Sequence, residues 1–196
     1  PAARNTGLTH STGAIIAFLD ADDLWQPDKI TKQLTKLPEA DMVFSNAKLI
    51  DETGRPLGTS FWDYIRVTPA RGRQTLVRLF RKNFIIPASS IIFKKTVSDK
   101  IGLFDERLKS IEDYDFTLRA ISAGCCLDFV DEELVSYRLN QSQMSGNLRR
   151  MEYWRIFVLG KFLIQHPALA FAHPVLAISR LGKRALALIY KTIFQK

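Results

Sequence analysis

Residues 14–23 read Ala-Ile-Ile-Ala-Phe-Leu-Asp-Ala-Asp-Asp, an apolar run that ends in three carboxylates within four residues. Short apolar runs with β-branched and aromatic members are typical of strands buried on both faces, as in the parallel part of an α/β sheet. Ligands of open α/β sheets bind beyond the carboxyl ends of the strands. The acidic end of this run, Asp20–Asp23, is therefore where we expect a binding site.

Two of these aspartates are predicted to contact a metal ion or a ligand. In an extended chain Asp20 and Asp22 point to the same side, so their charges repel unless a cation or hydrogen-bond donors neutralise them. Carboxylate oxygens suit Mg²⁺ or Mn²⁺, and such an ion takes its other ligands from substrate phosphates and water. Helix capping needs only one carboxylate, so for Asp23 two roles stay open, in the site or as a cap of the next helix.

The residues on both sides extend the pattern: Ala3–Gly7 reads Ala-Arg-Asn-Thr-Gly, Leu24-Trp25 follows the aspartates, and Pro27 and Lys29 come next. In this order they resemble the middle of the family 2 glycosyltransferases of the GT-A fold, which have an ARNxG turn, a buried strand, a DxD motif and a helix. The resemblance continues to about Ser145. It implies an α/β protein with a GT-A type mixed sheet flanked by helices, here lacking the first strands of the family.

The resemblance also implies a set of donor contacts. Arg4 and Asn5, Asp20-Ala21-Asp22 and Arg138 match positions that bind the nucleotide-sugar, with Asp22 and Asp20 holding Mn²⁺ or Mg²⁺. Spacing alone favours a solvated surface charge for Arg4. For Arg138, an ion pair with the acidic turn Glu132-Glu133 competes with a contact to the diphosphate.

A second acidic cluster, Glu112 and Asp113, opens a predicted helix that stops at Gly124. Ser110 with Asp113 three residues later matches a capping box, so spacing alone favours a carboxylate bonded to a backbone amide. Family 2 glycosyltransferases have an ED pair here whose aspartate is taken as the general base, so the resemblance assigns that role to Asp113, with Glu112 beside it. A carboxylate within about 3 Å of an acceptor hydroxyl can take its proton during attack on the anomeric carbon.

Other elements are predicted from pattern alone. Apolar residues at helical spacing predict a covering helix over 27–37, with Lys29, Lys32 and Lys36 on its outer face. Residues 41–50 contain a strand that leads into a hairpin with its turn at 51–54, and 125–130 and 134–138 are two strands separated by an exposed turn. The stretch 58–73 mixes aromatic and basic residues without a period, which suits an acceptor-facing lid and equally an aromatic plug on the core.

Composition and charge narrow the class of protein. The chain has 196 residues, 46% of them hydrophobic and 24% charged, as expected of a globular protein. The two cysteines are adjacent, which matches no metal-binding spacing and favours a reducing, cytoplasmic environment. Residues 149–196 carry nine Lys and Arg against one Glu, which accounts for the whole net charge of +8. The neutral remainder argues against a nucleic-acid partner.

The charge divides the chain into two parts. Residues 1–148 are predicted to form a partial GT-A domain without its N-terminal nucleotide-binding part, and 149–196 a basic amphipathic helical tail. Prolines interrupt the uncharged stretch 162–179, so a membrane-spanning helix is not expected. From residue 180 onward basic residues share one helical face, which suits either an anionic membrane surface or packing on the chain's own domain.

The sequence therefore predicts an inverting glycosyltransferase of the hexosyl type. It would move a sugar from a nucleotide-diphospho-sugar to a hydroxyl of a glycan or lipid-linked acceptor, in bacterial cell-surface polysaccharide or glycolipid synthesis. We expect it in the cytoplasm, or on the inner face of the plasma membrane if the tail binds there. Because the N-terminal third of the family has no counterpart before Pro1, we expect the chain alone to bind donor weakly or not at all. Two alternatives stay open, a non-catalytic sugar- or nucleotide-binding remnant and a membrane-surface interaction module.

Overall fold

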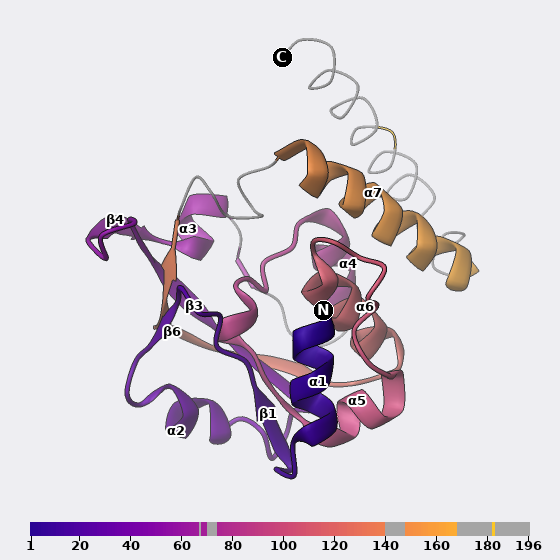
Figure 1. The fold of residues 1–196 in the computed structure, drawn as a ribbon, viewed down its shortest axis with the longest axis horizontal. Helices are drawn as coiled ribbons and strands as arrows, with labels where there is room; N and C mark the ends of the chain where they lie inside the picture. Colours follow the sequence, from indigo (N-terminus) through magenta and orange to yellow (C-terminus); the bar gives the residue numbers. More distant parts are fainter. Residues whose placement is uncertain (67, 70–73, 140–147, 168–181, 183–196) are drawn as a thin grey trace.

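A computed structural model of the chain describes residues 1–66, 68–69, 74–139, 148–167 and 182. Its strands are β1 (Ile15–Ala17), β2 (Leu24–Trp25), β3 (Met42–Ile50), β4 (Pro56–Ser60), β5 (Ile92–Lys94) and β6 (Leu127–Arg138). Its helices are α1 (Ala2–His10), α2 (Lys29–Leu34), α3 (Phe61–Ile65), α4 (Gln74–Arg81), α5 (Lys95–Ile101), α6 (Glu112–Ser122) and α7 (Leu148–Gln165), with a 3₁₀ turn η1 (Ala88–Ser90). In the described part the strands form one mixed sheet in the order β1-β5-β3-β6-β2, with β4 added beside β3 (Figure 1).

The centre of the sheet is the parallel pair of β3 and β6. The strand and the hairpin predicted over 41–54 are confirmed, because β3 leads through a turn containing Gly54, at φ +89°, into the antiparallel β4. The predicted break at 131–133 is wrong. β6 runs on through these exposed residues, and shifts in its register with β3 around Asn46 absorb the extra length as a bulge-like irregularity.

The apolar run over residues 14–19 forms a shorter and less buried strand than predicted. β1 spans three residues, pairs antiparallel with β5 and lies at the end of the strand order. Its Ile16 is buried, whereas Ile15 is 37% exposed. The prediction of a parallel strand buried on both faces was wrong, because apolar side chains do not specify which strand direction the backbone will pair with.

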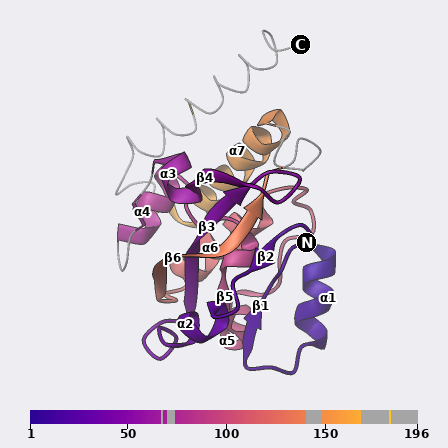
Figure 2. The ribbon, with the colours of Figure 1, turned by 90° about the vertical axis from the view of Figure 1, so that its left-hand side faces the viewer.

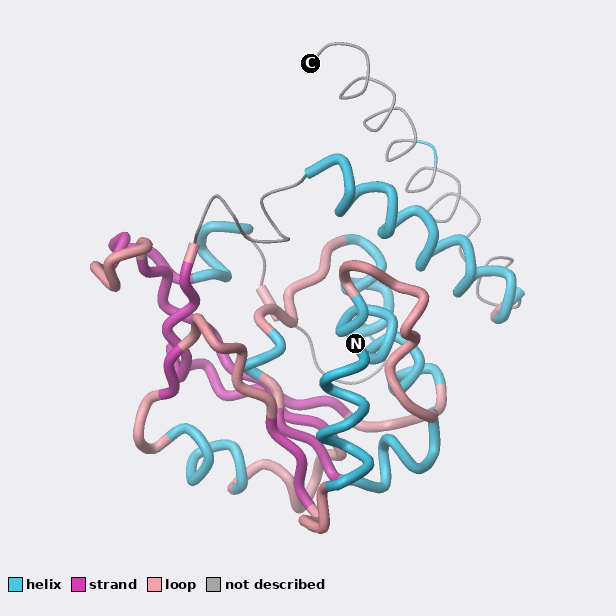
Figure 3. Tube along the Cα trace, in the orientation of Figure 1, coloured by secondary structure: helices cyan, strands magenta, loops and turns pink. Residues whose placement is uncertain are grey.

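The two faces of the sheet build two hydrophobic clusters, and β3 contributes to both. Alternate side chains point to opposite faces, so Met42 and Phe44 enter the larger cluster and Val43 the smaller one. Helix α2 covers the face of the smaller cluster, and α4, α5, α6 and α7 lie over the other face (Figures 1 and 2). Figure 3 shows the same division, with the strands between the two layers of helices.

Helix α2 is rotated relative to the prediction. Lys29 was predicted on the outer face but is fully buried, and the apolar Leu34 is 42% exposed. The Lys29 ammonium donates to Gln33 Oε1 at 2.6 Å and lies 4.4 Å from the centre of the Trp25 ring. Gln33 in turn donates to the carbonyls of Val43 and Ser90, so this polar pair ties α2 to the sheet.

Helix α7 packs against the rest of the described chain, although its residues fall in the predicted tail. Val158, Leu159 and Phe162 are buried in the larger cluster, and the Phe162 ring lies 5.6 Å from that of Phe80 on α4. Apart from Gly182, the amphipathic segment predicted from residue 180 lies outside the described residues. Within the described residues no helix has the length and hydrophobicity needed to cross a bilayer.

The buried lysine generates a stability prediction. Burial lowers the pKa of Lys29 from 10.5 to about 7, so between these values the unfolded chain binds a proton that the folded chain does not. Wild-type stability should therefore rise with pH relative to that of a Lys29→Met variant, by at most about 1.4 kcal/mol per pH unit from pH 7 to 9. Urea unfolding of both proteins at several pH values measures this difference.

The matched control is Lys100→Met, which removes an exposed lysine of α5. A difference between wild type and Lys29→Met that stays constant from pH 7 to 9 would contradict the burial of the ammonium.

Candidate active site

The acidic motif lies in a tight turn directly after β1. The backbone N–H of Asp23 donates to the carbonyl of Asp20 at 3.1 Å, which places Ala21 and Asp22 at the exposed centre of the turn. Asp20 is half-buried and Asp22 is exposed. The turn after β1 thus presents the Asp20 and Asp22 carboxylates at the end of the strand, while the Asp23 side chain is buried.

Asp23 is buried, with an exposed fraction of 4%, and holds this turn in place. Its Oδ2 accepts from Ser89 Oγ at 2.6 Å and its Oδ1 from the backbone N–H of Arg138 at 3.3 Å. The Ser89 hydroxyl also accepts from the backbone N–H of Asp20 at 3.0 Å. Burial raises the pKa of Asp23 to about 6, opposed by the Ser89 hydrogen bond. Asp23 does not cap α2, whose N-cap is Asp28.

Arg4 joins the two acidic clusters, which are about ninety residues apart in the sequence. From α1 its guanidinium donates to Asp20 Oδ1 at 2.6 Å and to Glu112 Oε1 at 2.5 Å. The exposed fractions of these side chains are 19% for Arg4, 37% for Asp20 and 8% for Glu112. Arg4 is therefore not a solvated surface charge, because it neutralises one carboxylate from each cluster.

Helix α6 begins at Glu112 without the predicted capping box. Ile111 at the N-cap has a left-handed backbone, with φ +56°, and Ser110 makes no cap to the helix. Asp113 accepts from the next residue's N–H, that of Tyr114, at 2.7 Å. The helix ends at Ser122, and Gly124 follows with φ +82°, so a C-terminal stop at glycine was the part of this prediction that was right.

Asp113 is half-buried beside a small apolar cavity. The cavity is lined largely by aromatic rings, among them Phe18, Phe93, Phe104 and Phe116. Burial raises the pKa of Asp113 to about 6, with a further rise from Glu112, while the Arg4 guanidinium opposes it. A carboxyl with such a pKa is mostly deprotonated at neutral pH but holds its proton more strongly than an ordinary aspartate, which suits a general base.

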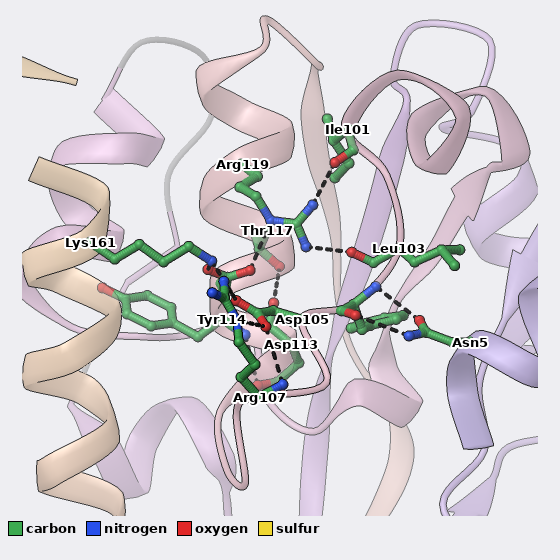
Figure 4. Close-up of polar contacts among 12 residues, drawn as sticks. Asn5, Ile101, Leu103, Asp105, Arg107, Asp113, Tyr114, Thr117, Arg119 and Lys161 are labelled. Atoms are coloured by element: carbon green, nitrogen blue, oxygen red, sulfur yellow. Dashed lines mark hydrogen bonds and ion pairs between the residues drawn. The ribbon is translucent and has the colours of Figure 1, made fainter. Parts of the chain in front are cut away.

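Asn5 is engaged within the protein. Its amide donates to the carbonyl of Phe104 at 3.0 Å and to Glu106 Oε1 at 2.8 Å, and its Oδ1 accepts from the N–H of Phe104 at 2.9 Å. Figure 4 shows this double contact with the segment that leads into α6. Asn5 thus fixes α1, and with it Arg4, relative to the helix that carries Glu112 and Asp113.

A network of charges anchors α6 from its other side (Figure 4). Lys161 on α7 pairs with Asp105 Oδ2 at 2.8 Å and with the buried Asp115 Oδ1 at 3.0 Å. Arg119 pairs with Asp115 at 2.8 Å and donates to the carbonyls of Ile101 and Leu103. The hydrogen bond from Arg107, together with Lys161, lowers the pKa of Asp105. One residue on α7 therefore helps to hold the helix that presents Asp113.

Arg138, at the end of β6, contacts the acidic turn after β1. Its guanidinium donates to the carbonyl of Asp22 at 3.0 Å and to those of Asp51 and Glu52 at 3.1 and 2.9 Å. The competing ion pair with the 132–133 turn is not what the structure places there, since Glu132 pairs with Lys32. Arg138 thus ties the acidic turn to the β3–β4 hairpin.

The described residues of the acidic turn do not complete the coordination shell of a metal ion by themselves. Among the described residues, no group of three His, Cys, Asp or Glu side chains lies close enough together to hold a metal ion. Asp20 is paired with Arg4, and Asp22 is exposed at the turn. This donor set fits an ion such as Mg²⁺ that takes one or two protein carboxylates and completes its shell with phosphate and water.

The structure thus brings together residues that the sequence analysis could only align separately. Asp20, Ala21, Asp22 and Arg138 lie at one turn, and Arg4 links that turn to Glu112, the neighbour of Asp113. Their roles toward a donor or acceptor stay predictions. Two positioning residues were not predicted from the sequence, Ser89 as a hydrogen-bond partner of the acidic turn and Lys161 as an anchor of α6.

Comparison with known proteins shows which family the sequence matches. The model of the family described as "Glycosyltransferase like family 2" matches residues 1–163, which includes most of α7. An uncharacterized glycosyltransferase of Methanocaldococcus jannaschii, MJ1057, is 27% identical over 81% of the chain and 53% of its own length. The amylovoran biosynthesis glycosyltransferase AmsB of Erwinia amylovora is 28% identical over 70% of the chain and 46% of its own length. The chain therefore spans about half the length of these relatives.

A solved structure has the same fold. S. aureus TarS 1–349 aligns over 98% of the chain and 51% of its own length with a TM-score of 0.58, at 18% sequence identity. TarS has also been solved in complex with UDP-GlcNAc. The similarity confirms the predicted mixed sheet of GT-A type flanked by helices.

The bridging role of Arg4 predicts strong coupling between Arg4 and Glu112. An Arg4→Met substitution removes the hydrogen-bonded guanidinium from the buried Glu112 carboxylate, which keeps only the Pro1 amine at 4.0 Å, and should cost about 1–3 kcal/mol of unfolding free energy. In a double-mutant cycle with Glu112→Gln, we expect a coupling of about 1 kcal/mol or more. Urea unfolding at pH 7.5 measures all four proteins.

The exposed ion pair between Lys32 and Asp28 is the matched control, because pairs of that kind couple by less than about 1 kcal/mol. Additive effects of Arg4→Met and Glu112→Gln would show that the guanidinium does not bridge the clusters in solution.

Proposed function

The chain belongs to glycosyltransferase family 2, and from this we propose that it transfers a sugar from a nucleotide-diphospho-sugar to a hydroxyl acceptor with inversion. The observation that carries the proposal is the link through Arg4 between the acidic turn after β1 and the carboxylate pair that opens α6. The leaving diphosphate and the attacking acceptor oxygen lie on opposite sides of one anomeric carbon. The turn that holds the diphosphate and the base that takes the acceptor's proton must therefore lie close together. A single side chain that contacts both clusters meets this requirement.

Asp113 is proposed as the general base. The acceptor oxygen attacks the anomeric carbon as its proton passes to the Asp113 carboxylate, and the bond from that carbon to the diphosphate oxygen breaks with its electron pair leaving on the diphosphate. Attack from the face opposite the leaving group inverts the configuration. Glu112, which pairs with Arg4, is proposed to position the base. The same guanidinium lowers the pKa of Asp113 and so opposes the rise caused by burial and by the Glu112 charge.

The acidic turn is proposed to hold the donor. Asp22, with Asp20, would hold Mn²⁺ or Mg²⁺, which would neutralise charge on the leaving diphosphate. The backbone of Ala21 lies exposed at the turn, where a phosphate can approach it. Arg4 would orient Asp20, and Asn5 and Arg138 would act through the main-chain segments that they hold. TarS binds UDP-GlcNAc, which makes UDP-sugars the first donors to test.

We propose cell-surface polysaccharide or glycolipid synthesis as the setting. The similarity to AmsB, a glycosyltransferase of amylovoran biosynthesis, supports a glycan acceptor. Hexosyl specificity, a cytoplasmic location and attachment to the inner membrane surface through residues 149–196 belong to the same proposal. The competing function is a non-catalytic sugar- or nucleotide-binding protein that retains the acidic turn but not the chemistry at Asp113.

The proposed base predicts a specific loss of transfer. The assay uses the protein extended by the N-terminal nucleotide-binding part of the family, because the chain alone is expected to bind donor weakly or not at all. In it, Asp113→Asn keeps the size of the side chain and removes its proton acceptor, so release of UDP from a panel of UDP-sugars with acceptor glycans should fall by about 100-fold or more. Donor affinity measured by calorimetry with Mn²⁺ should change little. Asp22→Asn should instead weaken donor binding.

Because the pKa of Asp113 is raised to about 6, its proton-accepting form is lost as the pH falls through that value. Wild-type transfer should therefore decline below about pH 6. Asp99→Asn, at an exposed position on α5, is the matched control. Transfer that survives Asp113→Asn would contradict the role of Asp113 as the base, and donor binding that survives Asp22→Asn would contradict the role of the acidic turn. Donor binding without transfer in the wild type would favour the non-catalytic alternative.

A further inference from the structure

A cluster of basic side chains lies on α3 and α4, outside the site described above. We call it the α3–α4 basic surface and define it by Arg66, Arg78 and Lys82, with Tyr64 beside them. All four side chains are exposed, Tyr64 by 64%. Figure 2 shows α3 and α4 next to each other at one side of the sheet.

The three cations are gathered around one backbone segment. Arg78 donates to the carbonyl of Thr68 at 3.0 Å, and Lys82 donates to the carbonyl of Ile65. Arg66 follows α3 directly, with a left-handed backbone at φ +52°. These bonds account for the position of two of the cations, but neutral carbonyls leave their positive charge uncompensated.

Carboxylates are scarce around this surface. Across the residues that the structure describes, none of the three cations lies within ion-pair distance of a carboxylate. Asp63, the carboxylate of α3, accepts from Ser60 Oγ at 2.7 Å. In the sequence, the stretch 55–82 contains seven Lys and Arg against this one aspartate. Because residues 1–148 are neutral as a whole, the charge of this stretch is a local concentration and not part of a generally basic body.

The helices that carry the surface pack against elements of the candidate active site through two contacts of their buried sides. The hydroxyl of Tyr114, next to Asp113, donates to the carbonyl of Leu79 on α4 at 2.9 Å. The ring of Phe61 on α3 lies 6.1 Å from that of Tyr137, the neighbour of Arg138. Helices α3 and α4 thus pack against the elements that carry the proposed base and hold the acidic turn.

From this placement we propose that the α3–α4 basic surface binds an anionic glycan, the acceptor chain on which the enzyme acts. The proposal rests on the proposed function and adds the chemical class of the acceptor. Several exposed cations bind a repeating carboxylate- or phosphate-bearing chain weakly one by one, and together they steer it toward the site. The exposed Tyr64 ring offers an apolar face with a polar tip, which suits a sugar ring between the charges.

The test compares two double variants of the whole chain that change charge equally. Arg66→Gln/Lys82→Gln removes two cations of the surface. The control, Lys36→Gln/Lys100→Gln, removes one lysine that follows α2 and one on α5. Binding of fluorescent polygalacturonate is measured by anisotropy at low and high salt, with dextran as the neutral glycan. We expect about 3- to 10-fold weaker polygalacturonate binding for the first variant only, a difference that shrinks with salt, and no binding of dextran.

Folding is checked by circular dichroism. If Lys82 proves necessary for folding, Tyr64→Ala/Arg66→Gln replaces two exposed side chains instead. Equal affinity of the variants and wild type for polygalacturonate would overturn the proposal. Binding to vesicles of phosphatidylglycerol is measured for the same variants. If Arg66→Gln/Lys82→Gln weakens vesicle binding but not polygalacturonate binding, the surface binds a membrane and the proposal is overturned. The glycan assay needs neither donor nor transfer, so its failure leaves the transferase proposal standing, and failure of donor binding leaves the glycan result interpretable.

Discussion

The site depends on one constraint, the need to hold several carboxylates together at neutral pH. Asp20, Asp22, Glu112 and Asp113 come from two distant parts of the chain, and like charges at close range raise each other's pKa. The guanidinium of Arg4 offsets this by pairing with one carboxylate from each part. The fork of an arginine suits this task better than a lysine, because its separate N–H groups reach two acceptors at once.

The rest of the structure keeps that guanidinium and those carboxylates in register. Asn5, one residue after Arg4, is bonded to the segment before α6, and Arg119 and Lys161 hold α6 through Asp115. Ser89 and Arg138 hold the acidic turn from the other side. The carboxylates are thus positioned by polar contacts from α1, α7, η1 and β6, which explains how a half-exposed turn can keep a defined geometry.

The interior also contains ionisable groups whose burial is costly. The Lys29 ammonium is fully buried against Trp25 and Gln33, and Asp23 is buried against Ser89. Burial favours the neutral form of each group, so it lowers the pKa of Lys29 to about 7 and raises that of Asp23 to about 6. Both residues lie within the segment that follows β1, so the stability of the region below the site is expected to depend on pH more than that of the apolar core.

The family, the β3–β4 hairpin, the end of α6 and the place of the acidic turn could be predicted from the amino-acid sequence, because these depend on short ordered motifs and local periodicity. The sequence did not determine that β1 is an antiparallel edge strand, that Lys29 faces inward, or that α6 begins without a capping box between Ser110 and Asp113. The contacts of Arg4 with Asp20 and Glu112, and of Lys161 with Asp115 on α6, arise only when the chain is folded. These contacts connect residues tens of positions apart, and their energies depend on burial and on the rotation of each helix, which no local pattern records.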